Sequence, residues 1–256
     1  MRIDVKEQIV REVTRVGNGA HIFTPKEWLG EEVVLTRIKK KSIKEKILDI
    51  LSLHLESIKG VYLYGSNARG EAEKDSDIDL LIICNKKITI KEKGFEIICL
   101  EEDSIKKALE ISPILIYSAL NEAIPIINEE LLEKLKKQYP PELDHFHSYV
   151  QETFKMIKIN ESILDPYSII FRLKGIYIID QLLRKEKYSN KKFKKWVLQR
   201  LPRIDFTSIY KAYKEFKENK KSIKVNDEQL KSILSFLKEQ TIDMESIIHD
   251  KKRKKA

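Results

Sequence analysis

Two aspartates, two residues apart, are the clearest chemical signal in this sequence of 256 residues. Asp77 and Asp79 begin an apolar run that continues to Ile83, and its composition is typical of a buried strand. Because side chains alternate between the two faces of a strand, both carboxylates project to the same side, about 7 Å apart along the chain. Neighbouring carboxylates repel each other, and a divalent cation bound by both removes the repulsion. The pair therefore predicts a metal site.

A glycine and a serine stand about ten residues before the aspartates. Gly65-Ser66 ends a short apolar run, Val61 to Tyr64, which is predicted to be a second buried strand, and Asn67 to Gly70 is predicted to form one helical turn. A glycine leaves backbone N–H groups free to converge on a phosphate, and the serine hydroxyl adds a donor. The turn and the aspartates together indicate a site for a nucleotide and its Mg²⁺. The simpler alternative is a hairpin whose acidic residues only make its turn soluble.

This pattern resembles the nucleotidyltransferase superfamily that includes DNA polymerase β, and most of all its small bacterial and archaeal branch. The matching residues are Gly65-Ser66, Arg69-Gly70 and the segment Asp75 to Leu80. The resemblance implies transfer of a nucleoside monophosphate from a nucleoside triphosphate to an acceptor hydroxyl, with release of pyrophosphate. It implies that Asp77 and Asp79 hold Mg²⁺, or Mn²⁺ in its place, and that Gly65, Ser66 and Arg69 bind the nucleotide. The acceptor, whether protein, nucleic acid or small molecule, stays open.

A third carboxylate is expected on a neighbouring strand, as in other members of the superfamily. Glu96 is the candidate, because it interrupts the apolar run from Gly94 to Leu100 and an acid embedded there needs a cation or a base beside it. With Asp77 and Asp79 it would complete a second metal site and act in catalysis. Glu101 and Glu102 are the alternatives if the register of the strand differs, and a purely structural Glu96 also stays open.

Residues 1–40 are expected to form a module of their own. Strands are predicted at Ile9 to Val16 and Glu32 to Ile38, on either side of Gly17-Asn18-Gly19 and Pro25-Lys26. This arrangement resembles the swapped-hairpin family of small DNA-binding proteins, the AbrB-type regulators and antitoxins. In that family two chains interlock, since about forty residues cannot bury a core alone. The resemblance implies a homodimer and a DNA or protein partner; a simple hairpin appended to the next domain is the alternative.

The rest of the sequence predicts an α+β fold, with a mixed-sheet nucleotidyltransferase domain at residues 42–139 and a helical bundle domain at 140–250. In the first we expect about four strands with helices on one face, and an edge strand, Ala123 to Ile127, that contains Pro125. The lysine-rich end, 251–256, is expected to be a disordered basic tail. Helical periodicity marks the bundle at residues 142–163, 166–185, 190–200, 205–219 and 226–249.

The composition limits the partners and the compartment. A net charge of +9 and a pI near 9.2 suit an anionic partner, such as a nucleotide or a nucleic acid, without selecting between them. Cys84 and Cys99 lie in apolar runs and are predicted to be buried free thiols. We expect no secretory signal, because the first twenty residues are charged throughout, and no apolar run approaches a membrane span. The chain is expected to be cytoplasmic.

A regulatory protein is the competing hypothesis. In this reading residues 1–40 bind DNA or a partner protein, and the nucleotidyltransferase domain only senses a nucleotide. An antitoxin that modifies a partner toxin with AMP is a third reading, drawn from small relatives. Absence of the third carboxylate would favour the sensor, and the presence of Glu96 favours the enzyme.

Overall fold

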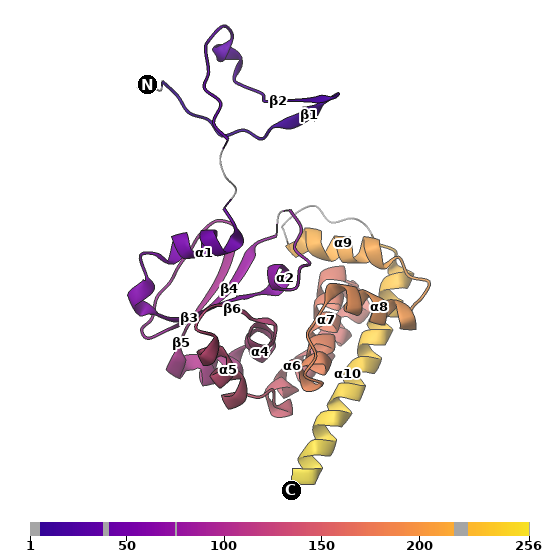
Figure 1. Cartoon of the computed structure of the whole chain (residues 1–256). Helices are drawn as coiled ribbons and strands as arrows, with labels where there is room; N and C mark the ends of the chain where they lie inside the picture. The colour runs from indigo at the N-terminus through magenta and orange to yellow at the C-terminus, as the bar shows by residue number, and fades with distance from the viewer. Residues whose placement is uncertain (1–5, 38–40, 75, 218–224, 256) are drawn as a thin grey trace. The chain divides into compact units, whose positions relative to one another are not determined.

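The computed structural model of the chain describes residues 6–37, 41–74, 76–217 and 225–255 (Figure 1). The chain divides into two compact units, Met1–Lys41 and Ser42–Ala256. The expected boundary between residues 139 and 140 does not separate compact units, because one apolar core extends from the sheet into the helices that follow.

The second unit contains a four-stranded sheet, as predicted. Its strand order is β5 (Phe95–Glu101), β4 (Ile78–Cys84), β3 (Ile58–Tyr64) and β6 (Ile124–Ile127). β3 runs antiparallel to β4 and β6, whereas β4 and β5 are parallel, so the sheet is mixed and the α+β class is confirmed. β6 lies at the edge, which suits Pro125 because proline has no N–H to donate to a further strand.

Helices cover both faces of this sheet, so the expectation of helices on one face was wrong. α1 (Ile43–Leu51) packs on one face through Ile47 and Leu51, together with alternate side chains of β3 and β4. The opposite face is covered by α3 (Ile105–Ile111), α4 (Pro113–Glu122) and α5 (Glu129–Gln138). The physical reason lies in β4, which is apolar after Asp79 without alternation and is therefore buried on both faces.

The predicted bundle helices are present, with bounds close to those expected. They are α6 (Leu143–Ile163), α7 (Pro166–Leu183), α8 (Asn190–Arg200), α9 (Phe206–Lys217) and α10 (Asp227–Lys255). The start of α7 is typical: Asp165 accepts hydrogen bonds from the N–H groups of Tyr167 and Ser168, and Pro166 occupies the first helical position. α10 continues through Lys255, so the expected disordered tail was wrong. Within the described ranges, none of the helices combines the length and apolar character that a membrane span requires.

The first unit has less regular structure than the sequence suggested. β1 (Thr14–Val16) and β2 (Gly19–His21) pair antiparallel across Gly17-Asn18, and a 3₁₀ turn follows at Lys26–Trp28. The expected strand at residues 9–16 is confined to its last three residues. Residues 32–37 form no strand, and Ile38, the end of that expected strand, lies outside the described residues.

Large apolar side chains of the first unit are left exposed. They are Val10, Val13, Val16, Phe23, Leu29, Val33, Val34 and Leu35, and between 48% and 78% of each is accessible. None of the described residues 6–37 is fully buried, so this part of the chain shows no core of its own, and burial of these side chains requires another surface.

Candidate active site

The Gly-Ser turn and the second aspartate are in direct contact. β3 ends at Tyr64, and α2 (Gly65–Ala68) follows at once, two residues earlier than the predicted helical turn. Gly65 has a φ of +70°, which disfavours any side chain, and a Cβ built on it would overlap Oδ2 of Asp79. Only glycine lets the turn approach this carboxylate so closely.

The loop between the turn and the first aspartate is tied at both ends. The side-chain amide of Asn67 donates a hydrogen bond of 2.8 Å to the backbone carbonyl of Asp77. The backbone N–H of Glu71 donates to the carbonyl of Ser66 at 2.9 Å. These bonds hold the loop between Ser66 and Asp77 in one conformation. Asn67 contributes to it, although the motif did not identify this residue. Asp75, part of the motif, lies outside the described residues.

The sheet brings Asp79 and Glu96 to the same level. Asp79 on β4 pairs in register with Tyr64 on one side and with Glu96 of β5 on the other. Asp79 is half-buried, whereas Asp77 and Glu96 are exposed. The expectation that Glu96 is embedded was therefore wrong: β5 is an edge strand and this carboxylate meets solvent.

The hydroxyl of Tyr64, at the end of β3, lies close enough to several carboxylates for their charge to affect its pKa. Its pKa is raised, first by burial and then by the negative charges of Asp79, Glu96 and Glu122. The three carboxylates thus act on one buried hydroxyl at the end of β3. Glu122 is neutralised by an ion pair with Arg69, so Asp79 and Glu96 are the two carboxylates here that suit a bound cation.

The alternative carboxylates lie at the other end of β5. Glu101 pairs in register with Cys84, five residues beyond the level of Glu96, which is about 16 Å along a strand. Glu102 accepts hydrogen bonds from Lys59 at 2.6 Å and from Lys134 at 3.1 Å. Glu96 is therefore the candidate that remains beside Asp79.

The donor set fits a hard divalent cation, although it is not assembled into a complete site. Carboxylate oxygens are the ligands that Mg²⁺ prefers, and Asp77, Asp79 and Glu96 offer them at one end of the sheet. In the part of the chain that the structure describes, no three acidic, cysteine or histidine side chains already form a group that could hold a metal ion.

Arg69, expected to bind the nucleotide, has two carboxylate partners. Its guanidinium makes an ion pair with Glu122 of α4 and a second, at 3.0 Å, with Glu71. The side chains of Arg69, Glu71 and Glu122 are only 14%, 10% and 4% exposed. The guanidinium also lies over the ring of Tyr188, 5.1 Å from its centroid. This placement gives Arg69 a role in positioning the turn.

Glu71 joins the same turn to the helical bundle. Its carboxylate accepts hydrogen bonds from the hydroxyl of Ser189 at 2.6 Å and from the backbone N–H groups of Asn190 and Lys191 at 3.1 and 3.5 Å. Burial raises the pKa of Glu71, and the hydrogen bonds from Ser189, Asn190 and Arg69 outweigh burial and lower it below its usual value. The sequence motif gave no signal for Glu71 or Glu122, except that Glu122 is an acid at the end of an apolar helix.

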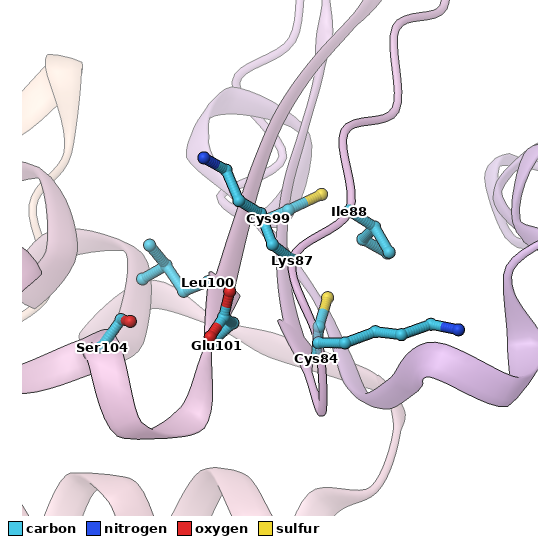
Figure 2. Close-up of a pocket in the computed structure, with 8 residues that line it drawn as sticks. Cys84, Lys87, Ile88, Cys99, Leu100, Glu101 and Ser104 are labelled. Carbon is cyan, nitrogen blue, oxygen red and sulfur yellow. The ribbon is translucent and has the colours of Figure 1, made fainter.

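A cavity of about 270 Å³ lies at the opposite end of the sheet (Figure 2). Cys84 and Cys99 line it together with Lys87, Glu101 and Ser104. Both cysteines are free, as predicted, with Cys84 buried and Cys99 half-buried. Burial, and then the neighbouring Cys99, raises the pKa of Cys84 to about 12, so its thiol stays protonated at neutral pH. This cavity is separate from the Asp79 site.

Comparison with known proteins agrees with this geometry. Residues 45–136, which contain the sheet and the carboxylates, match the family described as "Polymerase beta, Nucleotidyltransferase". Over 73 residues the chain is 38% identical to the "Putative protein adenylyltransferase" of Methanocaldococcus jannaschii, covering 28% of this chain and 74% of that protein. The chain belongs to the polymerase β-type nucleotidyltransferase family. It is a nucleotidyltransferase whose matched region is followed by a helical bundle.

The nucleotidyltransferase-like protein from Exiguobacterium sibiricum 255-15 aligns over 79% of this chain and 75% of its own, with 14% identity and a TM-score of 0.34. At this score the alignment adds nothing to the assignment.

Proposed function

We propose that this nucleotidyltransferase moves AMP from Mg²⁺–ATP to an acceptor hydroxyl and releases pyrophosphate. The observation that supports the proposal is the contact between Gly65 and Asp79, which joins a turn suited to phosphates to a carboxylate suited to a metal. ATP is the proposed donor because the relative from Methanocaldococcus jannaschii is described as an adenylyltransferase.

The proposed roles follow from the chemistry of each group. Asp77, Asp79 and Glu96 would hold Mg²⁺, with Mn²⁺ as the alternative; the ion supplies charge neutralisation of the triphosphate and lowers the pKa of the acceptor hydroxyl. Ser66 and the N–H groups beside Gly65 would bind the terminal phosphates. Arg69 would hold the Gly-Ser turn in position, and its positive charge would stabilise the phosphates bound there.

The reaction needs no covalent intermediate with the protein. The acceptor oxygen forms a bond to the α-phosphorus, the bond from that phosphorus to the bridging oxygen of the β-phosphate breaks, and the hydroxyl proton passes to water. Positioning and charge stabilisation then provide the catalysis, as in phosphoryl transfer generally. The exposed position of Glu96 supports access of an acceptor from solvent on the β5 side.

A protein hydroxyl is the first acceptor to test, because the relative is described as a protein adenylyltransferase. Nucleic acid and small-molecule hydroxyls are the other two classes. We infer that residues 1–40 bring a partner or a second copy of the chain. The exposed valines and leucines of this unit support that role, in line with the resemblance to AbrB-type modules.

The experiment uses ATP labelled in turn at the α- and γ-phosphates, with Mg²⁺ and a cell extract as the source of acceptor. We expect label from the α-phosphate to enter a macromolecular or small-molecule product, and label from the γ-phosphate to leave as pyrophosphate. Asp79→Asn should abolish both. Asp103→Asn, which removes an exposed carboxylate at the far end of β5, is the matched control and should keep both. Equal transfer by wild type and Asp79→Asn would refute the assignment.

A further inference from the structure

One stretch of this protein carries a large excess of positive charge. Residues 184–203 contain nine of the 49 lysines and arginines and one of the 40 acids, a net charge of +8. All nine basic side chains are exposed, from the turn after α7, along α8, to the turn before α9. They are Arg184, Lys185, Lys187, Lys191, Lys192, Lys194, Lys195, Arg200 and Arg203. We call this set the α8 basic surface.

Helix stability does not explain this arrangement. Lys191 lies three and four residues before Lys194 and Lys195, spacings at which like charges repel on a helix surface. Lys191 and Lys192 also occupy the first turn of α8, which contains no acid of its own, although the positive end of the helix dipole disfavours cations there. These lysines weaken the helix that carries them.

Intramolecular ion pairs account for only part of the surface. Lys192 pairs with Glu186 at 3.3 Å, Arg184 with Asp180 at 2.9 Å, and Arg200 with Glu239 at 2.5 Å. Among the described residues, Lys191, Lys194 and Lys195 have no carboxylate within ion-pair distance. Lys194 donates a hydrogen bond of 3.4 Å to the hydroxyl of Thr207, and its charge acts on the carboxylate of Asp205. Three exposed cations on one side of α8 are therefore available to an external anion.

The surface lacks the apolar anchors that a protein partner or a membrane requires. Phe193 and Val197 of α8 are fully buried, and no large apolar side chain in residues 184–203 is among the highly exposed ones. Protein interfaces depend on a buried apolar centre, and helices that lie on membranes insert an apolar face. A purely cationic face about 16 Å long, the length of α8, suits a phosphate backbone.

This surface begins beside the active-site loop. The carboxylate of Glu71 bonds to the N–H groups of Asn190 and Lys191, so the first lysine of α8 is in direct contact with the loop between Ser66 and Asp77. We propose that the α8 basic surface binds the phosphate backbone of a nucleic acid strand next to the nucleotidyltransferase site. This binding is independent of whether that strand is also the acceptor of the proposed transfer.

The test measures binding of the full-length protein to a mixed-sequence strand of twenty nucleotides, as RNA and as DNA in separate arms. We expect a Kd of about 1–100 µM near physiological salt, with affinity that falls steeply as salt rises. Replacing Lys191, Lys194 and Lys195 by glutamine should weaken binding about tenfold or more. It should also reduce the slope of log K against log salt by about 2, since each phosphate contact contributes about 0.7–0.9.

A matched triple variant controls for net charge. Lys87→Gln, Lys91→Gln and Lys93→Gln remove three exposed charges from the connection between β4 and β5, and this variant should bind like the wild type. Thermal melting checks folding; the α8 variant should melt at or above the wild-type temperature because repulsion is relieved. Asp79→Asn should bind normally, which separates failure of this proposal from failure of the proposed transfer.

Three outcomes would overturn the proposal. The first is no binding of either strand, and the second is an equal loss of affinity in the two triple variants. The third is stronger binding to polyglutamate, or to vesicles containing phosphatidylserine, which would assign the surface to an acidic protein or to a membrane. A difference between the RNA and DNA arms would identify which nucleic acid the surface prefers and would support the proposal.

Discussion

Asp79 and Glu96 occupy directly adjacent positions on two parallel strands, so one hydrogen-bonded register places both carboxylates at the same end of the sheet. The same register puts Glu101 beside Cys84 at the other end. Because the register is set by seven consecutive pairs, from Ile78 with Phe95 to Cys84 with Glu101, these two acids of β5 cannot exchange places without shifting the whole strand.

This relationship predicts that replacing Glu96 and replacing Glu101 by glutamine, on the same strand, have different effects. Glu96→Gln should leave ATP binding nearly unchanged, because Asp77 and Asp79 remain, and should reduce turnover by about 100-fold or more. Glu101→Gln should change neither. An ATP-binding titration beside a pyrophosphate-release assay measures both quantities. Similar turnover of wild type and Glu96→Gln would remove Glu96 from the site, and ATP binding without any pyrophosphate release would favour the sensor hypothesis.

Gly65 and Gly70 allow strain and contact to be separated. Both have positive φ, +70° and +65°, but a Cβ on Gly70 meets no atom within 4 Å, whereas one on Gly65 overlaps the Asp79 carboxylate. Gly70→Ala should cost only the conformational strain, about 1–3 kcal/mol of unfolding free energy. Gly65→Ala should cost more and should also abolish transfer. Urea denaturation and the labelled-ATP assay on both variants check this. Equal losses of stability and of transfer in the two variants would show that the contact between Gly65 and Asp79 is not needed for transfer.

The pH dependence of stability should report on Glu71. Its folded-state pKa lies below the usual 4.5, so its contribution is present above the unfolded pKa and is lost as the pH falls through the folded value. Glu71→Gln should destabilise the protein by about 1–3 kcal/mol at pH 7, and the difference from wild type should shrink below about pH 4.5. Glu73→Gln, at a side chain 72% exposed, is the control and should have little effect at any pH. A constant difference from pH 7 to pH 3 would contradict the assignment.

The exposed apolar side chains of the first unit predict association. The full chain should form a dimer, and a chain that starts at Ser42 should be a monomer, because every buried core residue of the described ranges lies in the second unit. Light scattering on both proteins measures this. A monomeric full chain would exclude the interlocked hairpin and leave the exposed residues for a different partner.

Much of the fold could be predicted because its signals are local. The run after Asp79 is apolar without a break, Pro125 marks an edge, and Pro166 begins a helix, so strand and helix bounds come out close to those observed. The adjacency of Gly65 and Asp79 could also be predicted from spacing alone, because a short hairpin-like connection returns the second strand to the end of the first.

Other features depend on contacts between distant residues. Arg69 has the position of a phosphate ligand in the motif, but its partner Glu122 is 53 residues away in the sequence. No local pattern predicts that pair. The strand expected at residues 32–38 was wrong where the structure describes it, because a run of β-branched and apolar residues forms a strand only when a partner strand is available. The prediction that Glu96 is buried was wrong for a related reason. Whether a strand is central or at an edge depends on the topology of the sheet, and β5 lies at an edge.

The hydrogen bonds of Glu71 have a consequence for how the molecule opens. Its carboxylate satisfies two N–H groups at the start of α8 that no turn of that helix can reach, while its own backbone N–H bonds to the carbonyl of Ser66 in the Gly-Ser turn. Opening of the loop therefore uncaps the helix, and fraying of the helix releases the loop. The amides of Asn190 and Lys191 should accordingly exchange hydrogen with solvent in step with those of the turn, as one cooperative unit that spans two regions of the fold.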